Sequence, residues 1–222
     1  MNPDLALAHE LADVADEITL GRFRASDLRV ETKPDLTPVS EADRAVERAI
    51  RERLERERPG EPVLGEEEGG EDARDGEAVL GMASAPALGR RWWAARGEGA
   101  FAGGRAIHVS RVGRLEDAVV STTSVKAVVG HGYGPAYEAI ARRSWATRGF
   151  SDFWQHMLLA EGSVDVAVEP VVELWDIAAV QVIVEEAGGR LTDLRGERTT
   201  RGGDCLTSNG LLHDELLELL AS

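Results

Sequence analysis

Cysteine and basic side chains are scarce in this sequence, and each shortage excludes a class of protein. Cys205 is the only cysteine among 222 residues, so neither an internal disulfide framework nor a cysteine-based zinc cluster is expected. Lys and Arg number 25 against 40 Asp and Glu, which gives a net charge of −15. A nucleic-acid partner is not expected, because binding a phosphate backbone requires a basic surface. An acidic protein can still bind a phosphate ester where divalent cations reverse the local field.

A long apolar run is also missing. No stretch approaches the ~20 residues that span a bilayer. Met1–Ile18 interleaves acidic residues and has no basic region before an apolar core, so it does not resemble a signal peptide. We therefore expect no membrane partner and a cytoplasmic location. The hydrophobic content of 43% is typical of a globular chain with a substantial core, in one or two domains.

The first third of the chain predicts two helices separated by an irregular segment. Apolar residues recur at helical spacing from Leu5 to Ile18. Residues 32–38 carry two prolines, which keep the preceding residues out of the helical region. Ser40 then begins a second helix, with Asp43 placed three residues later as its partner in a capping box.

Short strands are predicted to follow these helices. Pro62-Val63-Leu64 is typical of a buried strand that brings Glu66 and Glu67 to its carboxyl end. The segment 66–77 is acidic and rich in glycine, which predicts a loop. A β-meander is then expected, with strands at 79–85, 91–95, 100–102 and 107–109.

The second half alternates between strand and helix patterns, which indicates a layered α/β architecture. The expected strands are 118–122, 145–148, 164–168, 190–193 and 205–207. The expected helices are 135–143, 152–161, 176–187 and 213–220, and Gly188-Gly189 ends the third of them.

Three short patterns carry a resemblance to a known family. The first is Leu64-Gly65-Glu66-Glu67, and the second is Trp175-Asp176-Ile177-Ala178-Ala179 with Glu186-Ala187-Gly188-Gly189 after it. The third is a spaced set of polar residues, Lys33, Asp35, Thr37, Ser40 and Asp43. Together they resemble the inositol monophosphatase family of Mg²⁺-dependent phosphate-monoester hydrolases. The resemblance extends from the first helix to the last and implies an αβαβα sandwich. We expect 1–222 to form one phosphatase unit, with halves at about 1–120 and 121–222.

The resemblance also implies a metal site. Glu66 and Asp176 would bind Mg²⁺, as two or three ions. Glu66 would also be catalytic, together with Asp43, which would support a metal-bound water. Asp176 would in addition contribute to substrate binding. Carboxylates at a strand end and near a helix start suit the hard oxygen ligands that Mg²⁺ prefers. Taken alone, Asp176 is typical of a helix N-cap, and Glu67 is typical of a solvated acidic loop.

Glu169 lies seven residues before Asp176, where acids in the family contact the non-phosphate part of the substrate. The alternative is a surface glutamate at a strand end. The strings 150–156 and 168–170 resemble the histidinol-phosphatase branch of the family, which implies L-histidinol phosphate as the substrate and a homodimer. His156 is expected to face the interior. Within the class, an inositol-1-phosphatase or a fructose-1,6-bisphosphatase-like sugar phosphatase is the alternative.

One family segment has no counterpart in this sequence. The family carries Asp-Pro-Ile-Asp-Gly-Thr between the acidic loop and the strand that begins near Val79, and its two aspartates hold the catalytic metals. Here Gly76-Glu77 leads directly into that strand. Either the protein has lost the segment, or the full chain carries residues that this sequence omits. A true loss would severely impair catalysis, which makes an inactive binding or scaffold protein the alternative outside the enzyme class.

Overall fold

The structure, a computed structural model, describes residues 2–33, 38–70 and 77–221. It divides into two compact units, Met1–Glu77 with Ser84–Arg91 and Ala78–Ala83 with Trp92–Ser222, each of which we describe by itself. Across the described residues, no helix combines the length and the apolar character needed to cross a membrane.

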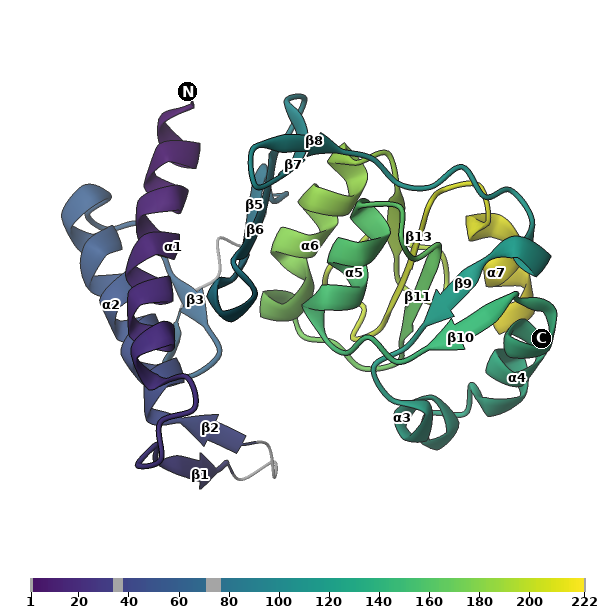
Figure 1. The fold of residues 1–222 in the computed structure, drawn as a ribbon, viewed down its shortest axis with the longest axis horizontal. Helices are drawn as coiled ribbons and strands as arrows, with labels where there is room; N and C mark the ends of the chain where they lie inside the picture. The colour runs from purple at the N-terminus through teal and green to yellow at the C-terminus, as the bar shows by residue number, and fades with distance from the viewer. Residues whose placement is uncertain (1, 34–37, 71–76, 222) are drawn as a thin grey trace. The chain divides into compact units, whose positions relative to one another are not determined.

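The first unit is built on a pair of helices. Helices α1 (Pro3–Arg22) and α2 (Glu41–Glu57) pack side by side (Figure 1). Strands β1 (Val30–Thr32) and β2 (Pro38–Ser40) pair in antiparallel fashion, as do β3 (Leu64–Gly65) and β4 (Gly69–Gly70). The capping box at the start of α2 is confirmed, because Asp43 Oδ2 accepts the Ser40 N–H at 2.7 Å while Ser40 Oγ accepts the Asp43 N–H at 3.3 Å.

Two expectations for this unit are wrong in detail. The segment around residues 32–38 was expected to be irregular, yet its two ends pair as β1 and β2. The acidic segment was expected to be a loop throughout, yet Gly69 and Gly70 pair with β3. Each strand is only two or three residues long, which is too short to show an alternating apolar pattern in the sequence. Asp35 and Thr37 lie outside the described residues.

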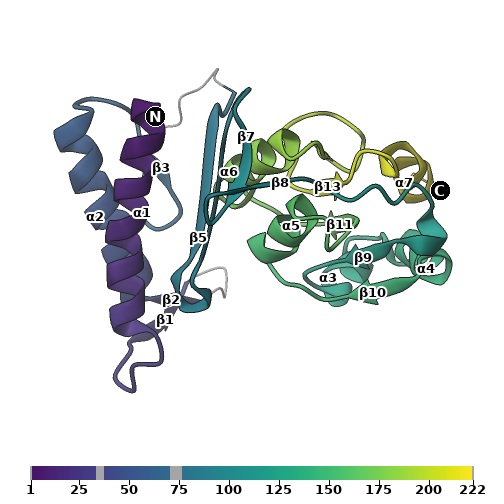
Figure 2. The ribbon, with the colours of Figure 1, turned by 45° about the horizontal axis from the view of Figure 1, so that its top comes forward.

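The second unit contains layers of sheet and helix, which Figure 2 shows from a second direction. A four-stranded sheet has the order β5-β6-β7-β8, with bounds Leu80–Ala85, Arg90–Ala95, Gly99–Ala102 and Arg105–Ile107. Residues 84–91, which connect β5 to β6 and include the short 3-10 helix Pro86–Leu88, belong to the first unit. Helices α5 (Phe153–Ala160) and α6 (Leu174–Glu186) pack together, and α6 contacts β7. Gly81 on β5 permits a close approach to Ala179 on α6, because a Cβ at position 81 would lie 2.2 Å from the Ala179 carbonyl oxygen.

The central sheet of this unit has the order β10-β9-β11-β13-β12. Its strands are Ala146–Arg148, Val119–Ser121, Val166–Glu169, Cys205–Ser208 and Arg190–Thr192. The first three strands run parallel to one another, and β13 is antiparallel to both β11 and β12. The remaining helical elements are the 3-10 helix Leu115–Asp117, α3 (Val125–Gly130), α4 (Gly134–Arg143) and α7 (His213–Leu220).

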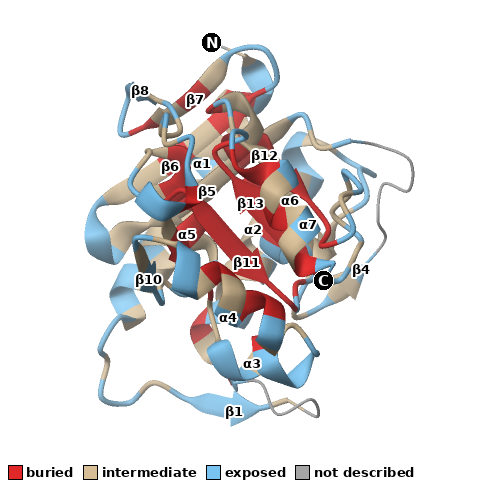
Figure 3. Ribbon diagram, turned by 90° about the vertical axis from the view of Figure 1, so that its right-hand side faces the viewer, coloured by how far each residue is buried: buried red, intermediate tan, exposed pale blue. Residues whose placement is uncertain are grey.

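The alternation of side chains along β11 determines where Glu169 points. Val166 and Val168 join the core that the central sheet forms with α3, α4 and α7. Side chains of a strand alternate between faces, so Ala167 and Glu169 lie on the opposite face, which α5 and α6 cover. All four residues of β11 are buried, and Figure 3 shows β11 and β13 in the buried centre. A carboxylate is thus carried into the interior.

Most elements of the second unit confirm the sequence expectation to within a few residues, with two corrections. The sequence pattern missed α3. Helix α6 begins at Leu174, so Asp176 is its third residue and not its N-cap. The Asp176 side chain still serves the helix start, because its Oδ2 accepts the Glu173 N–H at 2.8 Å. Cys205 is buried, as expected.

A buried histidine makes this unit sensitive to acid. Burial lowers the pKa of His213 to about 4, with a further contribution from the Arg190 charge. The unfolded chain therefore takes up a proton below pH 6.5 that the folded chain refuses, so stability is lost as the pH falls from 6.5 toward 4. We expect His213→Gln to reduce the loss of unfolding free energy between pH 7.5 and pH 5 by about 2 kcal/mol.

Urea unfolding at both pH values measures this change, and the difference between variant and wild type removes contributions from other titrating groups. The exposed His131 provides the matched control. A His213→Gln protein with the same pH dependence as His131→Gln would contradict the prediction.

Candidate functional site

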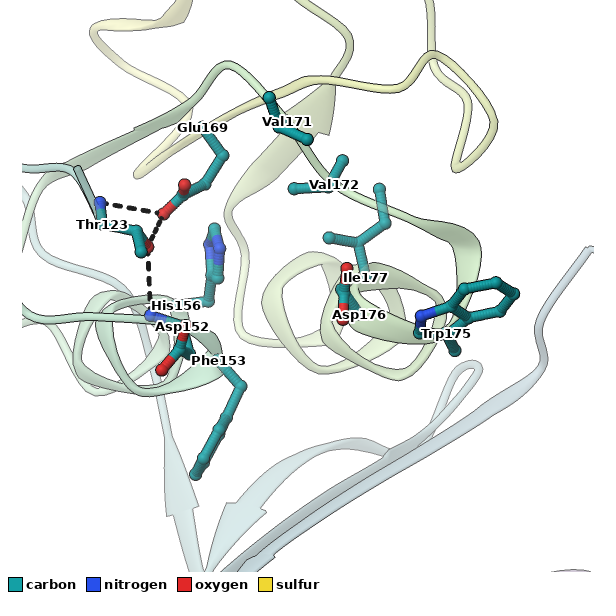
Figure 4. Close-up of a pocket in the computed structure, with 10 residues that line it drawn as sticks. All are labelled: Thr123, Asp152, Phe153, His156, Glu169, Val171, Val172, Trp175, Asp176 and Ile177. Carbon is teal, nitrogen blue, oxygen red and sulfur yellow. Dashed lines mark hydrogen bonds between the residues drawn. The ribbon is translucent and has the colours of Figure 1, made fainter. Parts of the chain in front are cut away.

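The second unit contains a pocket of about 340 Å³ between β11, α5 and α6. Figure 4 shows that its walls differ in character: Thr123, Glu169, His156 and Asp152 lie on one side, and Val172, Ile177 and Trp175 lie on the other. Glu169 and Asp176, the two residues that the sequence assigned to substrate binding, therefore line one pocket.

Thr123 connects the polar wall. Its Oγ1 donates a hydrogen bond to Glu169 Oε1, and its backbone N–H donates to the same oxygen at 3.1 Å. The hydroxyl oxygen also accepts the Asp152 N–H at 3.0 Å and a Gln155 side-chain N–H at 3.0 Å. One hydroxyl thus fixes the carboxylate at the end of β11 and the turn that begins α5.

Glu169 is a buried acid without a counter-charge. The residue is only 5% exposed. Burial raises its pKa to about 7; the two Thr123 hydrogen bonds oppose this shift, and the charges of Asp152 and Asp176 add to it. No Lys, Arg or His of the described chain forms an ion pair with Glu169. Near pH 7 the pocket can therefore accept either a proton or a cation.

His156 contributes a neutral ring to the same pocket. It is 3% exposed, and its Nδ1 lies 3.0 Å from Thr207 Oγ1. Burial lowers the pKa of His156 to about 4. The ring therefore remains uncharged at neutral pH and leaves the negative charge of the pocket uncompensated. The expectation that His156 faces the interior is confirmed.

A second cavity, of about 550 Å³, lies within the first unit and is lined by Asp43 and Glu66. The two residues that the sequence assigned to catalysis are thus brought to one cavity. The expected pairing of Glu66 with Asp176 joins residues of different units. That pairing stays a prediction.

Lys33 forms ion pairs with two carboxylates of the acidic turn at this cavity. Its Nζ lies 2.7 Å from Glu66 Oε1 and 2.8 Å from Glu67 Oε1. Hydrogen bonds to the two carboxylates, Glu66 first, raise the pKa of Lys33 above its usual range. The Glu66 side chain is 49% exposed whereas that of Glu67 is 10% exposed. The expectation of a solvated Glu67 is therefore wrong, because a lysine from a distant segment covers it.

Glu47 on α2 fixes the backbone of the same turn. Its carboxylate accepts the Glu67 N–H at 2.7 Å and the Glu68 N–H at 3.0 Å, and it pairs with Arg51 at 2.7 Å. Burial by itself would raise its pKa, but these hydrogen bonds outweigh burial and lower it. Gly65 leaves room for this carboxylate, because a Cβ at that position would lie 2.2 Å from Glu47 Oε1 and would displace it.

The described residues do not assemble a magnesium site. Mg²⁺ needs several oxygen ligands in octahedral geometry, and no group of three or more His, Cys, Asp or Glu side chains in 2–33, 38–70 and 77–221 is placed to hold a metal. Glu66 shares the Lys33 ammonium with Glu67, and Asp176 accepts a backbone N–H at the start of α6. The donors that the sequence assigned to the metal are thus occupied by other partners.

Comparison with known proteins identifies the class. The inositol monophosphatase family matches this chain over residues 1–74 and 73–222. The protein belongs to the inositol monophosphatase family. Similar solved structures include an IMPase from Thermotoga maritima, with a TM-score of 0.86 and 28% identity over 99% of this chain and 97% of that one. An inositol monophosphatase from Zymomonas mobilis has a TM-score of 0.86 and 29% identity over 99% and 98%. The expected fold class is confirmed.

Two curated relatives carry a more specific name. A histidinol-phosphatase from Mycobacterium tuberculosis is 45% identical over 98% of this chain and 97% of its own length. A histidinol-phosphatase from Streptomyces coelicolor is 43% identical over 98% of this chain and 96% of its own. The resemblance to this branch of the family is confirmed.

The comparisons also locate the missing segment. The alignment with the M. tuberculosis protein runs over 253 positions, against 222 residues here, so at least 31 positions (253 less 222) have no counterpart in this chain. The family match breaks at residues 73–74, within the acidic segment. This chain therefore lacks an internal segment of the family between the acidic residues and the strand that begins near Val79.

The roles of several residues in these two pockets were not predicted from the sequence. Thr123 and Asp152 carry no local pattern of a ligand site, since each lies just outside a regular element. Lys33 was noted, but not as the partner of Glu66 and Glu67. For Glu47 a signal existed, because Glu47 and Arg51 are spaced as an ion pair on one helix face.

Proposed function

We propose that this protein is a phosphate-monoester hydrolase that acts on L-histidinol phosphate, in histidine biosynthesis. The observation that carries the proposal is the buried, uncompensated carboxylate of Glu169 in a chain that is 45% identical to a histidinol-phosphatase. L-histidinol phosphate bears a primary ammonium, and a buried carboxylate binds such a group by a charge-assisted hydrogen bond. Inositol and sugar phosphates offer only hydroxyl groups to the same pocket.

The proposal gives each predicted site residue a role. Glu169 binds the ammonium group, and Asp176 contributes to substrate binding at the opposite wall. Asp43 and Glu66 serve the hydrolytic step, in which the bond from phosphorus to the ester oxygen breaks, a water oxygen bonds to phosphorus and the alcohol leaves with a proton. The family is generally metal-dependent, and Mg²⁺ is the ion we propose. The proposal further includes a cytoplasmic homodimer in which residues 1–222 act as one phosphatase unit.

A second function is supported by two specific observations. The segment missing after the first family match and the Lys33 ammonium between Glu66 and Glu67 both favour a protein that binds the phosphate ester without hydrolysing it. Phosphate release measured with and without Mg²⁺ separates the two functions. Calorimetric binding of L-histidinol phosphate without hydrolysis would support the second.

A substrate panel tests the branch assignment. We expect the highest kcat/KM for L-histidinol phosphate, compared with inositol 1-phosphate and fructose 1,6-bisphosphate, because only the first offers a cation to Glu169. A charge-assisted hydrogen bond at a desolvated site gives roughly ten- to a hundredfold preference. A preference for either of the other two esters would reject the histidinol branch and retain the family.

Intact mass determines which chain is being assayed. A protein of the 222 residues has a mass of 23.9 kDa. A chain with 31 further residues of the same mean mass would be about 3.3 kDa heavier. Mg²⁺-dependent hydrolysis is expected of the heavier chain, and hydrolysis is expected to be severely impaired in the lighter one.

A further inference from the structure

The pocket of the second unit contains more negative charge than the binding of one ammonium group requires. Asp152, Glu169 and Asp176 all line it. The Asp152 and Asp176 charges both contribute to the raised pKa of Glu169, so the three carboxylates influence one another. No ion pair involving Glu169 or Asp152 occurs in the described part of the chain.

Two side chains of this pocket each keep one polar atom free to bind a ligand. Glu169 is 5% exposed, and only its Oε1 has a hydrogen-bond partner among the described residues. His156 is 3% exposed, and its Nδ1 alone is bonded, to Thr207. Both residues line the pocket of about 340 Å³. Oε2 of Glu169 and Nε2 of His156 are therefore available to a polar ligand there.

Asp152 occupies a backbone conformation that favours glycine. Its φ is 54° and its ψ is −148°. This region is strained for any residue with a Cβ, at a cost of roughly 1–3 kcal/mol. A carboxylate is nonetheless placed here, at the entrance of α5, and its backbone is tied to Thr123. The strain is consistent with a role for the side chain in the pocket that it lines.

We propose that Glu169 and Asp152, joined through Thr123, form a two-carboxylate subsite that binds two nitrogen-bearing groups of one small ligand. The ammonium group is bound by Glu169 and the N–H of an imidazole ring by Asp152, while Val172 and Ile177 pack against the carbon atoms of the ligand. Thr123 is the positioning residue of the subsite. This inference rests on the proposed function and adds the residue that recognises the ring.

Binding of two alcohols to the full chain tests the subsite without any hydrolysis. L-histidinol offers both an ammonium and an imidazole N–H, whereas L-phenylalaninol offers the ammonium with a ring that has no N–H. Isothermal titration calorimetry at pH 8, where Glu169 is ionised, gives both affinities. We expect Asp152→Asn to weaken L-histidinol about threefold to fivefold, because Asp152 is exposed and water screens its charge. L-phenylalaninol should bind unchanged.

Asp117→Asn is the matched control, since it removes the same charge from an exposed site outside the pocket. It should leave both affinities at the wild-type value. If Asp152→Asn lowers the affinity for the two alcohols equally, Asp152 does not bind the imidazole ring. If the wild-type protein shows no binding of L-histidinol at millimolar concentration, the subsite is overturned.

Thr123→Val tests the positioning role. It keeps the shape of the side chain and removes the hydroxyl that orients Glu169, so affinity for both alcohols should fall about tenfold. The hydrogen bond from the Thr123 hydroxyl lowers the pKa of Glu169, so its loss should also move the pH at which binding strengthens to above the wild-type value. A purely structural role for Thr123 would not produce this shift.

The neighbouring residue supplies the control for this variant. Thr122 is buried and its Oγ1 has no hydrogen-bond partner among the described residues, so Thr122→Val should bind both alcohols normally. Thr123→Ser should restore binding. If Thr122→Val is as damaging as Thr123→Val, the positioning role fails. If the protein hydrolyses L-histidinol phosphate and Asp152→Asn binds L-histidinol as tightly as the wild type, the subsite alone is rejected. If the protein prefers inositol 1-phosphate as its substrate, the proposed function is rejected.

Discussion

Insertion of the missing family segment after Arg74 is expected to raise kcat for L-histidinol phosphate about a thousandfold in the presence of Mg²⁺. The inserted residues are the segment that the family carries at this place, with the two aspartates of Asp-Pro-Ile-Asp-Gly-Thr. In the present chain the Lys33 ammonium pairs with both Glu66 and Glu67, and in the described residues no group of three or more His, Cys, Asp or Glu side chains is placed to hold a metal. A catalytic metal contributes several kcal/mol, and each 1.36 kcal/mol is tenfold in rate.

A second insertion, identical except that both aspartates are asparagines, separates metal binding from the effect of added length. It should remain as slow as the parent chain. Mg²⁺ should raise the melting temperature of the aspartate insertion and leave that of the asparagine insertion unchanged. If the 222-residue chain already hydrolyses the substrate as fast as the aspartate insertion, the missing segment is not what limits catalysis.

The residues that sequence placed correctly are those whose role is local. Ser40 and Asp43 lie within one helical turn of each other, so a capping box can be read directly from their spacing. The helix at 213–220 was placed at its observed bounds, since its apolar residues recur with helical period. The layered fold followed from the order of such local elements.

The residues that sequence misplaced depend on distant partners. Glu67 was expected in solvent, but Lys33, more than thirty residues earlier, covers it. Two interpretations of Glu169 stayed open, a substrate-binding acid and a surface glutamate. A strand pattern indicates which face of the sheet a residue occupies, but not whether that face is buried. Burial on the α5 and α6 side distinguishes them. Asp176 was expected to bind a metal, with a helix N-cap as the alternative. The helix begins earlier, at Leu174, and Asp176 accepts the Glu173 N–H from its third position.

The second large effect is expected at Glu169 itself, where Glu169→Gln should strengthen the fold and weaken the site. Burial raises the pKa of Glu169 to about 7 from its usual value near 4.5. A folded-state pKa above the unfolded one gives stability that is complete below pH 4.5 and is lost as the pH rises through 7. The wild-type protein therefore holds a costly buried charge at pH 8. Glutamine keeps an oxygen for the Thr123 donors and removes that charge.

We therefore expect Glu169→Gln to raise the free energy of unfolding at pH 8 by up to about 3 kcal/mol, with little change at pH 5. The melting temperature at pH 8 should rise by about 5 °C or more. The exposed Glu98, changed to glutamine, is the control and should show neither effect. A Glu169→Gln protein that is no more stable than wild type at pH 8 would mean that the carboxylate is solvated.

The same variant should lose function where it gains stability. Without the negative charge, the ammonium of L-histidinol phosphate loses a charge-assisted hydrogen bond, which corresponds to a rise in KM of roughly ten- to a hundredfold. Hydrolysis of p-nitrophenyl phosphate, which carries no amine, should change much less. Equal losses on the two esters would assign Glu169 to the hydrolytic site or to the fold. A large loss on the amine ester alone, together with the gain in stability at pH 8, would show that the desolvated charge is retained for substrate recognition at the expense of the fold.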